Sequence, residues 1–294
     1  TDSLMLDIGL RAEHDDYTDQ KFIHPRVALH WYATNNLTVN TKVGTYSRFP
    51  DIDTALRKIG NPQIKSPKAT HYALGFEYNL NGIWQTSLDI YYKDLKDMAR
   101  STNEGEINEA LHYTNDLSGS AKGIEWVVKR EKQNGWYGWA SISWSKSDRT
   151  DDITDITTEY YLDTPLLANL VANYELNERW DFGVRLSIRS GQKYTPIIGL
   201  YENPDYNGHY LPQYGELNSK TLPVYHRLDL QANYKTTYFG NKAEWSFAML
   251  NALGSDNISG YYYAPDGTET LTNYTIEGEK GMEMFPSIGL KMQF

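Results

Sequence analysis

The stretch WDFGVRLSIRS, residues 180–190, alternates apolar and polar side chains without a break. One face of such a strand is apolar and carries Trp180, Phe182, Val184, Leu186 and Ile188. The other face is polar or small and carries Asp181, Gly183, Arg185, Ser187 and Arg189. Successive side chains of a β-strand point to opposite faces, so this period of two predicts a strand with one apolar and one polar side.

The same alternation recurs along the chain. It is clear at 4–11, 72–80, 83–93 and 227–235, and weaker at 26–32, 37–46, 123–130, 137–146, 166–174, 243–251 and 287–294. Together these stretches predict about twelve strands of roughly nine to eleven residues, the length of a tilted strand that crosses a bilayer. Strands of soluble proteins are usually about five or six residues long.

The connections between the predicted strands alternate in length. Short turns rich in Asn and Gly fall at 35–36, 81–82, 133–135, 177–179 and 239–241. Longer connections fall between these turns, at 48–70, 98–120, 148–164, 191–223 and 252–284. Of the connections on this side, only the one near 14–22 is brief. Asn and Gly suit tight hairpins. Short turns on one side and long loops on the other are typical of outer-membrane barrels, with the short turns in the periplasm.

Composition agrees with a barrel and excludes other classes. The 294 residues are 40% hydrophobic, with a mean hydropathy of -0.62 and no apolar run long enough for a spanning helix. Aromatic residues make up 14%, which suits interfacial girdles. The absence of Cys excludes disulfides and thiolate sites, and a net charge of -10 without a basic run argues against nucleic-acid binding. The sequence opens in a predicted strand without a signal peptide, so we expect a mature fragment of a longer protein.

Several short phrases occur in an order that resembles TonB-dependent outer-membrane transporters. They are His24-Pro25-Arg26, Tyr46 with Phe49-Pro50 and Gly60-Asn61-Pro62, Gly123-Ile124-Glu125, Ser190-Gly191 with Tyr194-Thr195-Pro196, Arg227-Leu228-Asp229, and Asn251. A terminal aromatic residue, Phe294, resembles the targeting signal of outer-membrane barrels. The resemblance covers roughly the last half of the barrel of this family, which has about 22 strands.

The resemblance implies an all-β fold, an antiparallel transmembrane β-barrel whose residues 1–294 contribute about twelve strands. No plug domain and no TonB box are present in these residues, so both are expected elsewhere. The implied location is the outer membrane of a Gram-negative bacterium. The implied partners are the TonB complex through an absent N-terminal region, a plug domain, outer-membrane lipid and lipopolysaccharide, the barrel-assembly machinery and a small-molecule ligand, without nucleic acid.

Three functions remain open. The first is TonB-dependent uptake of a scarce ligand such as a ferric siderophore, a cobalamin or an oligosaccharide. The second is a passive, porin-like channel of about twelve strands that closes on itself. The third is an outer-membrane enzyme, for which no catalytic constellation is visible. We expect no enzyme activity and no cofactor.

Candidate site residues lie in two places. Loop aromatics suit stacking on flat ligands, and the candidates are Tyr194, Tyr201, Tyr206, Tyr210, Tyr261 and Tyr262. Charged residues on the polar strand faces are expected to line the lumen, where they solvate it or contact substrate; they are Lys93, Glu125, Arg185, Arg189, Arg227 and Asp229. The acidic run 148–159 and the scattered His residues lack metal-ligand spacing, so no metal site is expected.

Overall fold

The computed structural model describes residues 3–56, 59–102, 112–205, 208, 210–265 and 274–293, and it is nearly all β. The main strands are β1 (Leu4–Asp15), β2 (Gln20–Tyr32), β3 (Leu37–Ser47), β4 (Lys68–Leu80), β5 (Trp84–Ser101), β6 (Tyr113–Gln133), β7 (Trp136–Asp151), β9 (Leu166–Glu175), β10 (Trp180–Arg189), β15 (Tyr225–Tyr238), β16 (Asn241–Leu250) and β19 (Phe285–Met292). Within the described ranges one helix occurs, α1 (Ile52–Ala55).

These strands form one antiparallel meander. The order of pairing along the sheet is β1-β2-β3-β4-β5-β6-β7-β9-β10-β15-β16-β19, and β8 (Ile156–Glu159) pairs with the end of β7. Each strand therefore lies next to its predecessor along the chain, as in an outer-membrane barrel. The sheet is not closed among the described residues, because β1 and β19 end the path.

All twelve predicted strands are present, but several are longer than predicted. β5 continues to Ser101, β6 begins at Tyr113 and β7 continues to Asp151. The predicted loop boundaries at 98–120 and 148–164 were therefore wrong. Beyond the lipid both faces of a strand meet water, so backbone pairing continues where the apolar alternation has ended.

The connections predicted at 191–223 and 252–284 contain small hairpins. Their strands are β11 (Lys193–Tyr194) with β14 (Lys220–Thr221), β12 (Ile197–Glu202) with β13 (Tyr210–Tyr214), and β17 (Ile258–Pro265) with β18 (Tyr274–Lys280). Apolar and polar residues do not alternate in them, since β12 has Ile at both 197 and 198 and β17 has Tyr at both 261 and 262, so no period of two marked them in the sequence.

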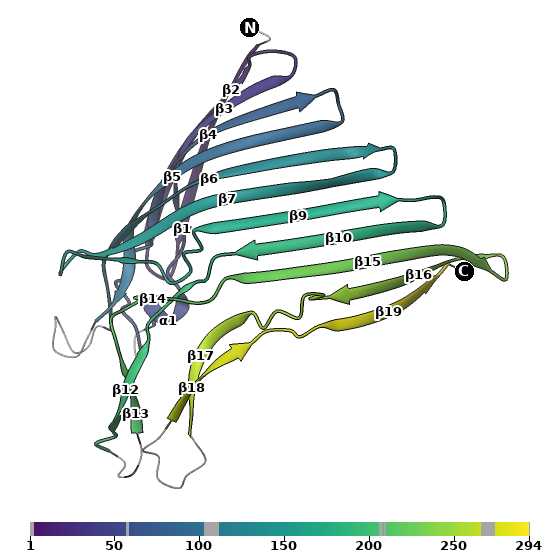
Figure 1. Cartoon of the computed structure of the whole chain (residues 1–294). Coiled ribbons are helices and arrows are strands. Elements are labelled where there is room, and N and C mark those ends of the chain that lie inside the picture. The colour runs from purple at the N-terminus through teal and green to yellow at the C-terminus, as the bar shows by residue number, and fades with distance from the viewer. Residues whose placement is uncertain are drawn as a thin grey trace. The chain divides into compact units, whose positions relative to one another are not determined.

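The chain divides into two compact units. One comprises Thr1–Leu80, Thr86–Trp126 and Trp144–Tyr160, and the other comprises Asn81–Gln85, Val127–Ser143 and Tyr161–Phe294. In the second unit, one tight turn joins β9 to β10 and another joins β15 to β16, both at one end of the strands, on the right of Figure 1. The hairpins β12/β13 and β17/β18 lie at the other end, at the lower left.

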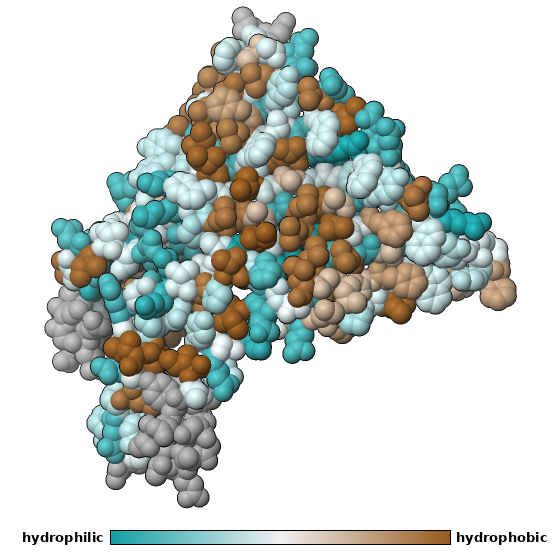
Figure 2. Space-filling view, in the orientation of Figure 1, coloured by the Kyte–Doolittle hydropathy of each residue, from teal (hydrophilic) through white to brown (hydrophobic). Residues whose placement is uncertain are grey.

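Burial is the reverse of that in a soluble protein. Among the described residues only Ala55, Ile64, Leu222 and Ala243 are buried apolar side chains, whereas Ile8 on β1 is 76% exposed. Figure 2 shows apolar side chains gathered on the surface over the strands. A sheet with one continuous exposed apolar face requires lipid to cover that face.

Aromatic side chains gather near the tight turns of the second unit. Ring centroids lie 4.5 Å apart in the pair Trp136–Tyr174 and 4.8 Å apart in the pair Trp180–Tyr234. Trp136 begins β7 and Trp180 begins β10, directly after their turns. This row has the position of an interfacial aromatic girdle, where an amphipathic ring meets both lipid and headgroups.

Candidate functional site

A polar ladder runs along the non-lipid face of β10 and β15. The register places Arg185 opposite Asp229, so the two side chains share one face. Arg227 lies two residues before Asp229, and its Nε donates a 2.7 Å hydrogen bond to Asp229 Oδ1. The guanidinium of Arg189 lies 4.6 Å from the ring centroid of Tyr225. Period-two alternation thus gathers the predicted Arg and Asp residues of this unit on one surface.

The ladder continues toward the tight turns. Asn233 Nδ2 donates to Asp181 Oδ1 at 2.7 Å, and Lys235 Nζ lies 3.1 Å from Asp181 Oδ2. Ser187 Oγ donates to Asn169 Oδ1 at 2.9 Å on the neighbouring strand. The face therefore carries hydrogen-bonded polar groups over most of the strand length, as a water-filled lumen requires.

Asn251 joins this ladder to the last long connection. Its backbone N–H donates to Asp229 Oδ1 at 2.9 Å. Its side-chain amide donates to the carbonyl oxygens of Ser255 at 2.8 Å and Met282 at 2.9 Å, and Asn251 is 1% exposed. Two phrases that seemed separate in the sequence, the Arg227–Asp229 pair and Asn251, therefore form one structural element.

A second polar chain crosses β1 to β4 in the first unit. His30 Nε2 lies 3.2 Å from Asp7 Oδ2, and His30 Nδ1 lies 2.6 Å from Asn40 Oδ1. Asn40 Nδ2 donates to Glu77 Oε1 at 2.7 Å. These residues were not among the predicted site residues, although their places on the polar positions of the predicted strands offered the signal.

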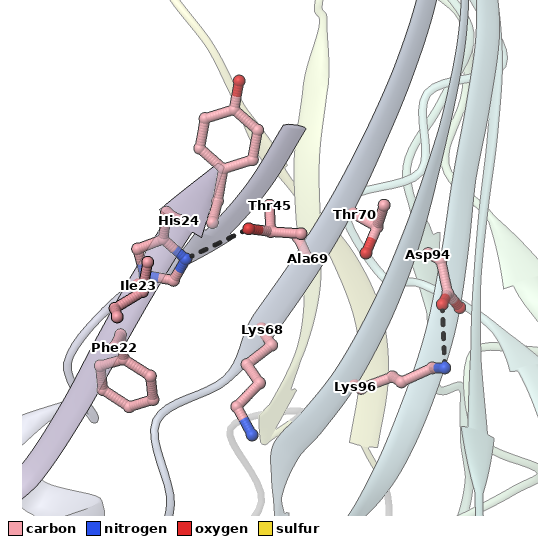
Figure 3. Close-up of a pocket in the computed structure, with 10 residues that line it drawn as sticks. Phe22, Ile23, His24, Thr45, Lys68, Ala69, Thr70, Asp94 and Lys96 are labelled. Atoms are coloured by element: carbon pink, nitrogen blue, oxygen red, sulfur yellow. Dashed lines mark hydrogen bonds and ion pairs between the residues drawn. The ribbon is translucent and has the colours of Figure 1, made fainter. Parts of the chain in front are cut away.

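A pocket of about 280 Å³ lies between β2, β3, β4 and β5 in the first unit, and Figure 3 shows its lining. His24 is buried at its edge, with Nε2 2.8 Å from Ser47 Oγ and 3.4 Å from Glu13 Oε2. Lys96 Nζ lies 3.2 Å from Asp94 Oδ2. The pocket thus offers two kinds of group, an imidazole held by oxygens and an ion pair.

The Gly60-Asn61-Pro62 phrase forms a compact turn over α1. A Cβ on Gly60 would lie 2.4 Å from the carbonyl oxygen of Thr54, so only glycine fits there. Asn61 Nδ2 donates a hydrogen bond to the carbonyl oxygen of Tyr113 at 2.9 Å. The backbone N–H of Asn61 donates to the carbonyl oxygen of Thr54 at 2.7 Å. The phrase therefore fastens this connection to the beginning of β6.

The tyrosine candidates lie on the small hairpins. The rings of Tyr194 and Tyr261 are 5.2 Å apart, so the connections 191–223 and 252–284 meet there. Burial raises the pKa of the Tyr194 hydroxyl. The hydroxyl of Tyr262 donates to Glu277 Oε2 at 3.1 Å, and this carboxylate raises the pKa of Tyr262. Tyr201 on β12 and Tyr210 on β13 are one register position apart.

The other predicted residues are dispersed. Lys93 on β5 lies 5.1 Å from the ring centroid of Tyr91, and Glu125 is exposed on β6 in the first unit. Tyr206 and Phe294 lie outside the described residues. Over the described ranges no group of three or more His, Asp or Glu side chains has the geometry to hold a metal ion. The described helical segment is too short to span a membrane.

Comparison with known proteins identifies the family. Residues 1–258 match the family described as "TonB dependent receptor-like, beta-barrel". A search of curated protein sequences finds no match.

Three solved structures share the fold. The siderophore receptor PirA from Acinetobacter baumannii has a TM-score of 0.70 and 14% identity, covering 100% of this chain and 44% of that chain. The ferripyoverdine receptor of the outer membrane of Pseudomonas aeruginosa, bound to ferripyoverdine, has a TM-score of 0.68 and 17% identity, covering 99% of this chain and 36% of that chain. The FrpB iron transporter from Neisseria meningitidis has a TM-score of 0.67 and 16% identity, covering 98% of this chain and 43% of that chain.

The chain thus spans less than half the length of the solved structures that it matches. These proteins are described as transporters and receptors. The family match confirms the predicted all-β barrel fold and outer-membrane location, and it confirms that the family is one of transporters. The chain belongs to the TonB-dependent receptor family and forms part of its outer-membrane β-barrel.

Proposed function

We propose that this chain is the C-terminal barrel region of a receptor that takes up a ferric siderophore with energy delivered by TonB. The observation that carries the proposal is the family match over residues 1–258 on a sheet with an apolar outer face. Solved relatives described as a siderophore receptor and a ferripyoverdine receptor favour a ferric siderophore over a cobalamin or an oligosaccharide.

The ligand surface would lie on the Tyr-bearing hairpins. Tyr194 and Tyr261 bring two long connections into contact at a ring distance of 5.2 Å. The exposed rings of Tyr201 and Tyr262 lie on the same connections. Flat aromatic surfaces at the end opposite the tight turns suit the first capture of a chelate that contains aromatic or planar groups.

The polar ladder would line the path inward. Arg185, Arg227 and Asp229 share one face, and hydrogen bonds between neighbouring groups fix their positions. This surface either contacts a plug domain or meets the ligand during passage, and both roles need a wetted polar wall.

The open sheet favours the receptor over a passive twelve-strand pore. β1 and β19 each have one neighbouring strand in the described structure. Within lipid an unpaired strand edge leaves N–H and C=O groups without partners, which costs several kcal/mol for each group. We infer that strands outside this chain complete the barrel, and that a plug domain and the TonB contact belong to the same receptor.

Uptake in cells with and without TonB tests the proposal. The receptor that carries this chain would be expressed in a strain lacking its own siderophore receptors, and transport of iron-55 bound to catecholate and hydroxamate siderophores would be measured. Cyanocobalamin and maltodextrin serve as the other ligand classes. We expect saturable iron uptake that requires TonB, and equal uptake without TonB would contradict the proposal.

A paired substitution tests the hairpin surface. Replacing both Tyr194 and Tyr261 with Ala is expected to weaken siderophore binding about tenfold, because two central aromatic contacts are lost. Tyr238→Ala removes the same side chain at the tight-turn end and is expected to leave binding unchanged. Equal affinity of all three proteins would show that the ligand binds elsewhere.

A further inference from the structure

A groove of about 330 Å³ lies on the outer face of the sheet, beside the tight turns of the second unit. Its lining includes Trp84 from the beginning of β5, Arg130 from the end of β6, Trp136 from the beginning of β7, and Leu170 and Ala172 from β9. All of these residues belong to one compact unit.

The groove opens on the lipid-facing side. Leu170 and Ala172 lie opposite Leu186 and Val184 in the register of β9 and β10, so they share the apolar face of the predicted strand 180–190. Trp84 and Trp136 are exposed on this face, at 43% and 50%. The polar ladder occupies the opposite face of the same strands.

The floor of the groove is made of backbone and small side chains. A Cβ on Gly138 would lie 2.1 Å from the carbonyl oxygen of Val171, so β7 and β9 approach more closely here than any side chain at this position would allow. Ala140 and Ala172 are the neighbouring lining residues. Trp84, Trp136 and Trp139 line the same groove, so its wall is largely apolar.

Arg130 supplies a fixed positive charge at the end of this groove. Its Nη1 donates to the carbonyl oxygen of Gln133 at 3.1 Å and also to that of Trp136. Its guanidinium carbon lies 5.5 Å from the ring centroid of Trp84. These contacts hold the guanidinium at the level of the turn 134–135, the depth at which lipid headgroups meet an aromatic girdle.

The charge of Arg130 has no carboxylate partner among the described residues, unlike its neighbours. Lys132 pairs with Glu175, and Lys129 Nζ lies 2.6 Å from Glu131 Oε1. The contacts of Arg130 are two carbonyl oxygens and one ring, which leave the other N–H groups of the guanidinium fork open to an anion. A phosphodiester matches that fork.

We propose that this groove binds one phosphatidylglycerol molecule of the periplasmic leaflet. Its phosphodiester accepts hydrogen bonds from Arg130, and one acyl chain lies between Trp84 and Trp136 over the Gly138 floor. The single negative charge of this lipid matches Arg130, the one cation among the residues that line the groove, whereas phosphatidylethanolamine carries an ammonium group that opposes Arg130. The site needs membrane insertion only, and it is independent of which ligand the receptor transports.

Lipid binding to the whole receptor tests the site. The receptor that carries this chain would be purified in a charge-neutral detergent and titrated with phosphatidylglycerol, with phosphatidylethanolamine and with uncharged diacylglycerol, and bound molecules would be counted by native mass spectrometry. We expect one phosphatidylglycerol to bind about tenfold more tightly than diacylglycerol, the effect of one charge-assisted contact. Equal binding of the three lipids would overturn the role of the phosphate.

Matched variants separate the charge from the groove. Arg130→Gln is expected to weaken phosphatidylglycerol binding about tenfold and to leave diacylglycerol binding unchanged. Ala172→Phe fills the groove and is expected to abolish the binding of both. Lys242→Gln removes a cation from β16 outside the groove and is expected to change neither. Heat-modifiable gel mobility reports whether each variant is folded, and wild-type affinity in folded Arg130→Gln would overturn the proposal.

Discussion

Asn251 is the residue at which a single substitution has the most calculable effect. It is 1% exposed and lies in the left-handed region with φ of 48°. Its side chain makes three hydrogen bonds, to the carbonyl oxygens of Ser255 and Met282 and from the backbone N–H of Ser255 at 3.2 Å. Together these bonds join the two ends of the connection between β16 and β19.

The expected loss follows from these contacts. Each buried hydrogen bond contributes about 1 kcal/mol net, so Asn251→Ala removes about 3 kcal/mol. Alanine in the left-handed region adds about 1 kcal/mol, because its Cβ is crowded there whereas Asn and Gly tolerate the conformation. We therefore expect the free energy of unfolding to fall by about 4 kcal/mol for Asn251→Ala and by about 3 kcal/mol for Asn251→Gly.

Urea unfolding of the receptor in lipid vesicles, followed by tryptophan fluorescence, measures these differences. Asn251→Asp is the isosteric control, since it replaces a donor amide with a carboxylate that faces two carbonyl oxygens, and we expect it to be at least as unstable as Asn251→Gly. Limited proteolysis within 252–284 reports whether the damage is local. A loss below 1 kcal/mol for Asn251→Ala, or wild-type stability of Asn251→Asp, would refute the hydrogen-bond reasoning.

Two further substitutions have matched controls. In Gly191→Ala the new Cβ would lie 1.7 Å from the carbonyl oxygen of Leu222, so we expect a destabilisation of about 2–4 kcal/mol and faster proteolytic cleavage within 191–223. The control is Gly199→Ala, whose Cβ meets the flexible end of Gln213 at 3.1 Å. Equal cleavage rates of the two variants would contradict the clash at Gly191. Arg100 Nε lies 2.6 Å from Asp151 Oδ2 and lowers the pKa of Asp151, so Arg100→Gln is expected to cost about 2–3 kcal/mol at neutral pH. Because the pKa of Asp151 is lowered in the fold, this stabilisation is present above the ordinary pKa of 3.8 and is lost as the pH falls and Asp151 protonates, so the two unfolding curves should converge in acid. The exposed pair Arg48–Asp51 is the control, and Arg48→Gln should cost less than about 0.5 kcal/mol at any pH.

Local periodicity was enough to predict the strands but not their contacts. The alternation in 180–190 predicted β10 within one residue, and the same rule placed Arg185 and Asp229 on one face. The hairpin β12/β13 was not predicted because Tyr210–Tyr214 contains a proline and because Ile197 and Ile198 of β12 are apolar in succession rather than alternating with polar residues. Pairing of this kind depends on the partner strand rather than on a period.

For the candidate site, the sequence likewise predicted which strand face carries the charged residues but not which residues contact one another. A charged residue on a polar strand position needs only its own strand to be recognised. The role of Asn251 needs Met282, which is 31 residues away in the sequence. The meeting of Tyr194 with Tyr261 likewise joins two connections whose paths no local pattern describes. Long-range contacts of this kind depend on how the connections fold against one another, and no local pattern in a single sequence indicates them.

The inverted burial of this protein has a consequence for the effect of substitutions. In a solid interior, exchanging Leu for Val opens a void that rigid neighbours do not fill, which adds to the cost. On the outer face of this sheet the neighbour is fluid hydrocarbon, which flows into any such space, so apolar residues are interchangeable there at little cost. We therefore expect apolar substitutions on that face to have little effect on stability, whereas the same substitutions in a solid interior would be costly. We expect substitutions to be costly instead at positions such as Gly191, which lies against the backbone of Leu222, and Asn251, whose side chain binds backbone carbonyl oxygens.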